Sequence, residues 1–276
     1  PYTDDTVTGG YDYTLDGTGV DIVIQDSGIQ ADHPEFQDAQ GVSRVQEIDW
    51  YTASGLPGTM PAGHYTDYDG HGTHCAGIAV GKTYGWGKNA RIYAVKVNGL
   101  EGGTDPNGGI PISDCFDVIK EWHNNKPVDP ATGAKRPTIV NMSWGYGQRY
   151  ASVSEIVYRN TSYTGTDIDN GTKRATYGLL NVSDLFSYLT NLRIASIDAD
   201  VQELIDAGVH VSIAAGNRSH KIDVSGGVDY DNYATVSYGL TTTTAYYHRG
   251  SSPYDDEAHI VGSIDSTING GGLDQK

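Results

Sequence analysis

The sequence has few cysteines and few cationic residues, and it lacks any long apolar run. Its two cysteines, Cys75 and Cys115, lie in neither a CxxC nor a metal-type spacing, so we interpret both as free thiols. Lysine and arginine total 18 against 35 aspartates and glutamates, which gives a net charge of −17. A protein this acidic repels phosphate backbones and anionic lipids, so nucleic acid and membranes are not expected partners. No run approaches the roughly 20 apolar residues that a membrane-spanning helix requires.

Short apolar runs alternate with segments of helical spacing along the 276 residues. Runs that end at Gly, Asp or Asn are typical of buried parallel strands, because both faces of such a strand are apolar. These runs are 20–25, 91–97, 138–142, 209–215 and 259–262. Helical spacing follows Pro111 at 112–119 and precedes Gly208 at 197–205. The pattern predicts an α/β fold with a doubly wound, mostly parallel sheet and helices on both faces, in which active sites gather at the carboxyl ends of the strands.

Two stretches interrupt this alternation. They span about 146–195 and 218–257 and are rich in Tyr, Thr, Ser, Asn and Gly without a clean period. Connections this long are usually functional or flexible, so we interpret both as surface insertions. The length suits one domain with a sizeable core, and we predict a single domain over residues 1–276.

The first candidate functional residue is Asp26, in the segment Asp26-Ser27-Gly28-Ile29 directly after the strand predicted at 20–25. A carboxylate at the carboxyl end of a strand can orient an imidazole. An aspartate in such a turn also commonly bonds to nearby backbone amides, which is a purely structural role. The segment alone leaves both interpretations open.

The second candidate is His71, in the segment from Asp69 to Gly77 that reads DGHGTHCAG. Glycines flank His71, and the small residues that follow predict a helix that packs tightly below it. His71 and His74 are three residues apart and share a helix face, so they could also bind a metal together. No third potential ligand lies at a sequence spacing that is typical of a metal site, and we predict no metal site here.

The third candidate is Asn217, at the end of the segment VSIAAGN that begins at Val211. An asparagine at the end of a strand can donate its side-chain N–H to an oxyanion that forms on a substrate carbonyl. An asparagine that merely closes a turn is the alternative.

Together and in this order, the three segments resemble the subtilisin-like serine protease family (subtilases, peptidase S8). The family's motifs for its aspartate, histidine and oxyanion asparagine read much like DSGI, HGTHCAG and AAGN. RIYAVKV at 91–97 and IVNMSWG at 139–145 resemble the same family, so the likeness covers most of the chain. HGTHCAG followed by KTYG at 82–85 is most similar to the proteinase K branch, in which a cysteine follows the second histidine.

The resemblance implies a role for each matching residue. Asp26 would orient His71, His71 would act as the general base, and Asn217 would donate to the oxyanion. His74 would support the helix rather than contact substrate. The remaining implied residues line the primary specificity pocket, where an extended polypeptide substrate pairs as an added strand: Ser143, Trp144 and Gly145, with Gly108 and Gly109 as the opposite wall.

The sequence departs from the family at the nucleophile. The family carries its serine in a Gly-Thr-Ser-x-Ala-x-Pro segment, and residues 1–276 contain no such string. Ser251, Ser252 and Ser266 lack this context, so we interpret none of them as the nucleophile. We expect that the serine segment lies outside this chain, either as a separate C-terminal fragment that stays bound or as sequence beyond an excerpt.

Two functional hypotheses follow. The first is a serine endopeptidase of the subtilisin type that acts on polypeptides and is extracellular or associated with a particle. The alternative is a catalytically inactive, subtilase-like structural or binding component of a larger assembly. Members of the family often bind calcium, and Glu35 matches an acidic ligand position. We predict no specific calcium site and no cofactor. Weak calcium binding at surface carboxylates is compatible with the acidic composition.

Overall fold

The computed structural model describes residues 12–97, 108–169, 188–217, 221–262, 264–269 and 272–275. The chain falls into two compact units. Unit 1 comprises Pro1–Ser143 and Asp200–Ser212, and unit 2 comprises Trp144–Ala199 and Ile213–Lys276. The single domain predicted over residues 1–276 stays a prediction.

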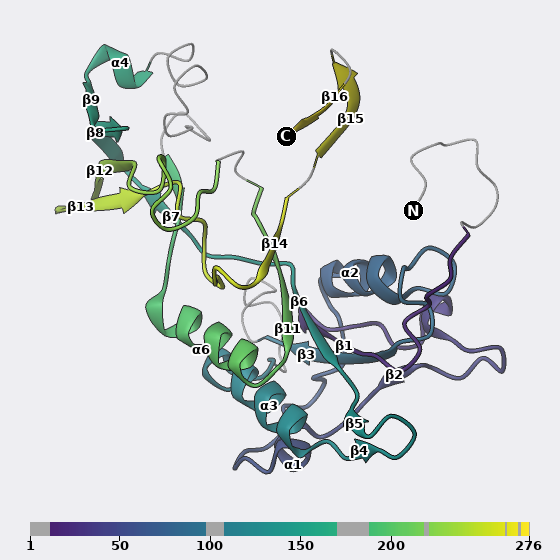
Figure 1. The fold of residues 1–276 in the computed structure, drawn as a ribbon. Coiled ribbons are helices and arrows are strands. Elements are labelled where there is room, and N and C mark those ends of the chain that lie inside the picture. Colours follow the sequence, from purple (N-terminus) through teal and green to yellow (C-terminus); the bar gives the residue numbers. More distant parts are fainter. Residues whose placement is uncertain are drawn as a thin grey trace. The chain divides into compact units, whose positions relative to one another are not determined.

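A parallel sheet forms the centre of unit 1 (Figure 1). Strand β1 (Asp21–Asp26) lies between β3 (Arg91–Lys96) and β6 (Thr138–Met142), and β2 (Val45–Gln46) pairs with β3; these three pairings are all parallel. The full strand order is β14-β11-β6-β1-β3-β2, with β11 at His210–Ala214 and β14 at His259–Val261. The predicted α/β fold with a mostly parallel sheet is therefore confirmed.

Helices lie on both faces of this sheet (Figure 1). Helix α2 (His71–Val80) covers one face, and α1 (Trp50–Ser54) and α3 (Ile112–Asn125) cover the other. Helix α3 begins after Pro111, as expected, and α6 (Ala195–Asp206) matches the second helix expected from the sequence. A short 3-10 turn, η1 (Pro34–Phe36), and the small hairpin of β4 (Val128–Asp129) with β5 (Ala134–Lys135) complete the described elements of unit 1.

The two faces of the sheet have different cores. On the α2 side, Ala76 and Val80 pack in a buried aliphatic cluster that includes Ile24 and Ile92. On the other side, the rings of Trp50, Tyr93 and Trp122 lie 4.7–6.2 Å apart, and Trp50 Nε1 donates to the Ala94 carbonyl at 2.8 Å. Burial on both faces explains why Ile22, Val23 and Ile24 in the middle of β1 are consecutive apolar residues. It also fixes the carboxyl end of β1 beneath the beginning of α2.

Unit 2 contains an antiparallel sheet built from the two stretches that interrupt the sequence pattern. Its strands follow the order β13-β12-β8-β9. The first stretch supplies β8 (Ser152–Tyr158) and β9 (Thr161–Thr164), and the second supplies β12 (Tyr233–Tyr238) and β13 (Thr241–Tyr246). Side chains from both stretches form one buried cluster, which consists of Tyr150, Ile156, Ile168, Ala234, Val236, Ala245 and Tyr247. The two stretches thus share a core of their own.

The other described elements of unit 2 are short. Strand β7 (Gly147–Tyr150) pairs with β10 (Tyr188–Asn191), β15 (Ile264–Asn269) pairs with β16 (Gly272–Gln275), and α4 spans Thr166–Asp169. Residues 170–187 of the first stretch and 218–220 of the second lie outside the described residues.

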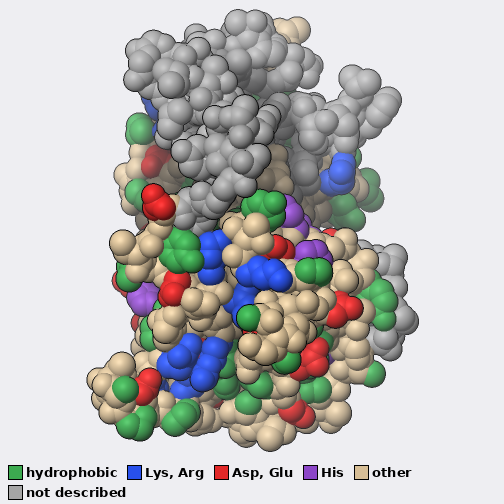
Figure 2. All heavy atoms as spheres, turned by 90° about the vertical axis from the view of Figure 1, so that its right-hand side faces the viewer, with side chains coloured by type: hydrophobic (Ala, Val, Ile, Leu, Met, Phe, Trp, Pro, Cys, Tyr) green, Lys and Arg blue, Asp and Glu red, His purple; other side chains and the backbone are tan. Residues whose placement is uncertain are grey.

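No helix in the described part of the chain has the length and apolar character needed to cross a membrane. The face drawn in Figure 2 carries Lys and Arg side chains interspersed with Asp and Glu, and its hydrophobic side chains are scattered. The acidic excess of the whole sequence is therefore not concentrated on the described part of this face.

Candidate active site

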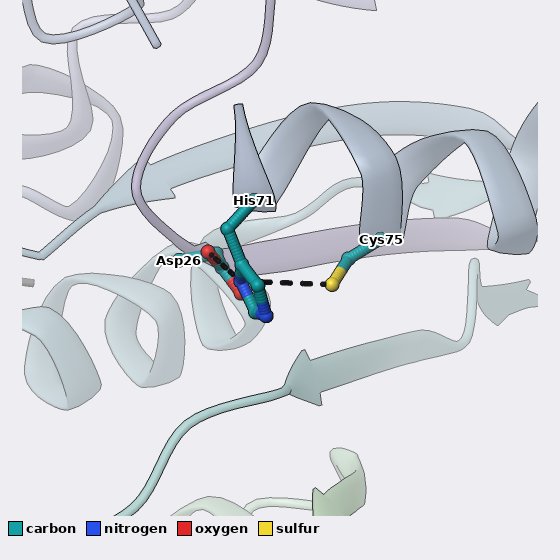
Figure 3. Close-up of side chains that lie close together, drawn as sticks. All are labelled: Asp26, His71 and Cys75. Atoms are coloured by element: carbon teal, nitrogen blue, oxygen red, sulfur yellow. Dashed lines mark hydrogen bonds and ion pairs between the residues drawn. The ribbon is translucent and has the colours of Figure 1, made fainter. Parts of the chain in front are cut away.

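Asp26 and His71 come together in unit 1 (Figure 3). Asp26 is the last residue of β1, and His71 is the first residue of α2. Asp26 Oδ1 and His71 Nδ1 are 2.8 Å apart, which is a hydrogen-bond distance. The carboxylate side chain is 2% exposed, whereas the imidazole is 49% exposed. A buried acid thus holds one edge of a ring whose other edge can reach solvent.

Glycines allow this close approach of β1 and α2. A Cβ atom at Gly72 would lie 2.1 Å from the Gly28 carbonyl oxygen, so only glycine lets the helix begin this near to the turn after β1. Gly70, directly before α2, has a φ of +90°, a conformation that other residues rarely adopt. The glycines of the two sequence motifs therefore have a steric role.

Ser27 and Asp67 brace the beginning of α2. Ser27 Oγ accepts a hydrogen bond from the Gly72 N–H at 2.9 Å and donates to Asp67 Oδ1 at 3.0 Å. Asp67 also accepts from the Gly70 N–H at 2.8 Å and from the Thr73 N–H at 2.9 Å. These bonds satisfy N–H groups that have no partner inside a helix. Sequence reasoning missed both roles; a carboxylate four residues before the first helical residue is the signal that could have indicated the Asp67 cap.

Lys96 anchors the loop that carries Asp67. It is the last residue of β3 and lies opposite Asp26 in the parallel register. Its buried side chain donates to the Thr66 carbonyl at 2.5 Å and lies 4.8 Å from the centre of the Tyr68 ring. The charge is thus held by a carbonyl and an aromatic face. No role for Lys96 was expected from the sequence.

The electrostatic environment favours the protonated form of His71. The pKa of His71 is raised, chiefly because Asp26 accepts its hydrogen bond; partial burial opposes the shift, and the negative charges of Asp69 and Asp67 add to it. Burial also raises the pKa of the Asp67 carboxyl, but hydrogen bonds from Thr73, Gly70 and Ser27 outweigh burial and hold it below its ordinary value.

Both cysteines are free thiols, as predicted. Cys75 lies one turn after His71 on α2, with its Sγ 3.8 Å from His71 Nδ1 (Figure 3). Burial raises the pKa of the Cys75 thiol, and that of Cys115 is raised further because this side chain is fully buried.

His74 does not join this group. Its side chain is exposed and lines a hollow of about 550 Å³ together with His33, Phe36, Ile78 and Tyr84. The only cluster of three or more potential metal ligands among the described residues is Asp26, His71 and Cys75. The pairing of His71 with His74 that the sequence left open as a metal site has no third ligand in this region.

Glu35 forms hydrogen bonds to the loop that follows α2. One of its carboxylate oxygens accepts from the Thr83 N–H at 2.9 Å, and its backbone carbonyl accepts from the Lys82 N–H at 2.9 Å. Burial raises the pKa of Glu35, but the bonds from Thr83 and the charge of Lys82 outweigh burial and lower it overall. Glu35 therefore secures the loop after α2.

The residues proposed for the specificity pocket lie in both units. Ser143 directly follows β6 in unit 1, and its Oγ accepts from Asn141 Nδ2 at 2.9 Å. Trp144 and Gly145 begin unit 2, where the Trp144 ring meets Tyr146 edge-on at 5.8 Å. A Cβ atom at Gly145 would lie 2.6 Å from Ser251 Oγ, so a larger residue does not fit there.

The remaining predicted residues follow β11 or precede α3. Asn217 belongs to unit 2, where it is exposed and follows β11 after Gly216, whose φ is +91°. Gly108, with a φ of +62°, and the buried Gly109 lead into Ile110 of unit 1. Residues 98–107, directly before Gly108, lie outside the described residues.

The serines that we did not interpret as the nucleophile are Ser251, Ser252 and Ser266, and the first two are buried. Ser252 Oγ donates to Asp198 Oδ1 at 2.6 Å and accepts from the Ile194 N–H at 2.6 Å. Ser251 is 6% exposed. The side chain of Ser266 lies outside the described residues.

Comparison with known proteins identifies the family. The family model described as "Subtilase family" matches residues 17–269 of this chain. The chain belongs to the subtilase family. The resemblance stated from the sequence motifs is thereby confirmed at the level of the family, and the chain is homologous to subtilisin-like serine endopeptidases.

Fungal proteases are among its relatives. A "Cuticle-degrading serine protease" of Orbilia oligospora is 37% identical over 131 residues, which cover 48% of this chain and 28% of that protein. "Subtilisin-like proteinase Spm1" of Pyricularia oryzae is 27% identical over 248 residues, which cover 87% of this chain and 32% of that protein. Among solved structures, the CspB protease of Clostridium perfringens matches 74% of this chain and 37% of that chain, at 19% identity and a TM-score of 0.38. The chain thus spans about a third or less of the length of these two fungal relatives.

Proposed function

We propose that the full-length protein is a serine endopeptidase that cleaves polypeptides through a covalent acyl-enzyme. In this mechanism Asp26 orients His71, and His71 takes the proton of a serine that lies outside residues 1–276. Asn217 donates a hydrogen bond to the oxyanion. The observation that carries the proposal is the 2.8 Å contact between Asp26 Oδ1 and His71 Nδ1, which joins two residues far apart in sequence.

The geometry suits general-base chemistry. A carboxylate that accepts from Nδ1–H fixes the tautomer in which Nε2 carries the lone pair, so the ring can take a proton from a hydroxyl. The buried Asp26 then stabilises the imidazolium that forms, in line with the raised pKa of His71. A base of this kind typically contributes about 10²–10⁴-fold to the rate.

The substrate contacts are assigned by their matching positions. We propose that Ser143, Trp144 and Gly145 line the primary specificity pocket, that Trp144 narrows it, and that Gly108 and Gly109 form the opposite wall. The exposed position of Asn217, three residues after the end of β11, supports its role as a donor to the oxyanion, because an exposed amide is available to a ligand.

Two finer assignments belong to the same proposal. We place the protein nearest the proteinase K branch, because Cys75 follows the second histidine of the motif as it does in that branch. We also propose that the protein works outside the cell or on a particle, in keeping with its acidic, Gly- and Tyr-rich composition.

A fluorophosphonate probe tests the mechanism, because it labels an activated serine covalently. We expect the full-length protein to be labelled at one serine beyond residue 276. His71→Ala should slow labelling by about 10²–10⁴-fold. As a control, His210→Ala replaces an exposed histidine at the start of β11 and should label at the wild-type rate.

The same experiment separates the two hypotheses. A folded full-length protein that resists labelling, and whose sequence lacks a Gly-Thr-Ser-x-Ala-x-Pro segment, would be the inactive structural or binding component. Labelling that is unaffected by His71→Ala would contradict the assigned general base.

A further inference from the structure

Three different metal-ligating groups converge at the beginning of α2 (Figure 3). Asp26 supplies a carboxylate oxygen, His71 supplies Nδ1 and Cys75 supplies Sγ, and these three atoms all lie within 4.8 Å of one another. His71 and Cys75 are four residues apart on one helix and therefore share a face, while Asp26 reaches the same point from the end of β1. Two rigid elements thus fix the group.

The distances suit a small tetrahedral ion. Zinc binds thiolate sulfur at about 2.3 Å and imidazole nitrogen or carboxylate oxygen at about 2.0–2.2 Å, so its ligand atoms lie about 3.4–3.6 Å apart. The oxygen and nitrogen are 2.8 Å apart, and the nitrogen and sulfur are 3.8 Å apart. To reach the values of a zinc site, the first separation would lengthen by about 0.6–0.8 Å and the second would shorten by about 0.2–0.4 Å.

A second observation points to a ligand at this place. Asp26 is 1% exposed, and its second carboxylate oxygen, Oδ2, is buried without a hydrogen-bond partner among the described residues. A buried carboxylate oxygen without a donor is costly, and a cation would satisfy it. The imidazole is half exposed, so a metal ion can reach the group from solvent.

We propose that Asp26, His71 and Cys75 form a zinc site that reversibly switches off the protease. Binding removes the proton of the Cys75 thiol, which passes to solvent. It also displaces the proton of His71 from Nδ1 to Nε2, because Nδ1 now binds the metal. The thiolate and the carboxylate together balance the two charges of zinc. With Nε2 protonated, the imidazole cannot accept a proton from the serine. This loss of activity rests on the proposed function, whereas the binding of zinc to the three residues does not.

Cobalt serves as the probe of the site, because a thiolate bound to Co²⁺ gives a charge-transfer absorption in the near ultraviolet and tetrahedral Co²⁺ gives visible bands. We expect the metal-free full-length protein to bind one Co²⁺ with both signals and Zn²⁺ to displace it. Cys75→Ser and Cys75→Ala should each abolish the charge-transfer band and weaken zinc binding at least about 100-fold, since second-shell partners alone are worth about 10–100-fold. Cys115→Ala, which removes the other, fully buried thiol, should keep both.

The inhibition is measured separately, as the rate of fluorophosphonate labelling with and without zinc, each variant relative to its own zinc-free rate. Zinc should suppress labelling in the wild type and in Cys115→Ala, and should have at least about 100-fold less effect in the Cys75 variants. A missing thiolate band, or a band that survives both Cys75 substitutions, would overturn the site. A protein that binds cobalt through Cys75 but never labels would refute the proposed protease and leave the metal site standing.

Discussion

Two glycines of α2 provide a matched test of how this helix is held against β1. A methyl group at Gly72 would lie 2.1 Å from the Gly28 carbonyl oxygen and 3.2 Å from Asp26 Cβ. A methyl group at Gly77 would meet no described atom within 4 Å outside its own helix turn. Gly72→Ala should therefore push α2 away from the turn after β1, whereas Gly77→Ala should only improve the helix.

The expected effects have opposite signs. Heavy atoms essentially never approach a Cβ closer than 3.0 Å, so the start of α2 must move by about 0.9 Å, the difference from 2.1 Å, to accept a methyl group at Gly72. Overpacking of this kind costs about 1–3 kcal/mol. Strain on the hydrogen bond from the Gly72 N–H to Ser27 adds about 1 kcal/mol, and the higher helix propensity of alanine returns at most about 1 kcal/mol. We expect Gly72→Ala to lower the free energy of unfolding by about 1–3 kcal/mol and Gly77→Ala to raise it by about 0.5–1 kcal/mol.

Urea-induced unfolding of both variants measures these differences, provided that the slope with denaturant stays the same. NMR titration of the His71 ring adds a local measurement. Its raised pKa should fall toward the ordinary value in Gly72→Ala, because displacement of α2 lengthens the bond to Asp26, and should not change in Gly77→Ala. Equal shifts of stability in both variants, or a Gly72→Ala protein as stable as the wild type, would refute the steric role assigned to Gly72.

Three further predictions test other contacts. Asp26→Asn should lower the pKa of His71, as measured by NMR. The pKa of His71 in the folded protein lies above its unfolded value of about 6.5. The pair with Asp26 therefore stabilises the fold fully below about pH 6.5 and loses this contribution as the pH rises through the raised pKa. The difference in unfolding free energy between wild type and Asp26→Asn should accordingly be larger at about pH 5 than at about pH 9. A thiol reagent or mercurial should modify Cys75 in the native protein and Cys115 only after unfolding, so two rapidly reacting native thiols would contradict the burial described. Asn160 has a φ of +63° in the turn between β8 and β9, so Asn160→Gly should be nearly neutral in urea unfolding, whereas Asn160→Val should cost about 1–2 kcal/mol; equal stabilities would contradict this turn.

The sequence allowed the central sheet to be predicted because burial on both faces leaves a local pattern. Strands β1, β3, β6, β11 and β14 all coincide with apolar runs, and two of the three predicted helices lie where apolar spacing follows Pro111 or precedes Gly208. The third predicted helix, α2, lies where small residues follow His71. β2 and α1 were missed since they are too short to show a period. Helix α1 depends on one cap instead, in which Asp49 accepts from the Thr52 N–H at 2.9 Å.

The antiparallel sheet of unit 2 was not predicted, because its pairings join distant segments. Val236 of β12 pairs with Val153 of β8, and the register shifts at this point. Such long-range pairing follows from the shared core and leaves no signal in one strand alone. The alternation in β12, where Ala234 and Val236 are buried between the polar Thr235 and Ser237, did indicate a strand, but not which strand it pairs with.

Sequence motifs identified the two residues that meet in the site, but the contacts that brace them depend on the path of a loop. Ser27, Asp67 and Lys96 come from three separate segments, and their hydrogen bonds converge around the start of α2. Apart from the position of Asp67 shortly before α2, nothing in the spacing of these residues predicts that convergence. The glycines are different, because Gly70 and Gly72 belong to the motif itself and their steric role could be inferred from their position beside His71.

β1 contains two buried aspartates, and their different partners, rather than their burial, decide what each negative charge stabilises. Asp21 and Asp26 are both 1% exposed and lie at opposite ends of the strand. Asp21 contacts Lys126 Nζ at 2.7 Å and Arg136 Nε at 2.8 Å, so fixed cations compensate its charge at every pH at which they stay protonated. Asp26 faces an imidazole, which becomes a cation only after it accepts a proton. The buried charge of Asp26 therefore favours the protonated state of His71, and a general base gains this stabilisation in the step in which it removes a proton from the nucleophile.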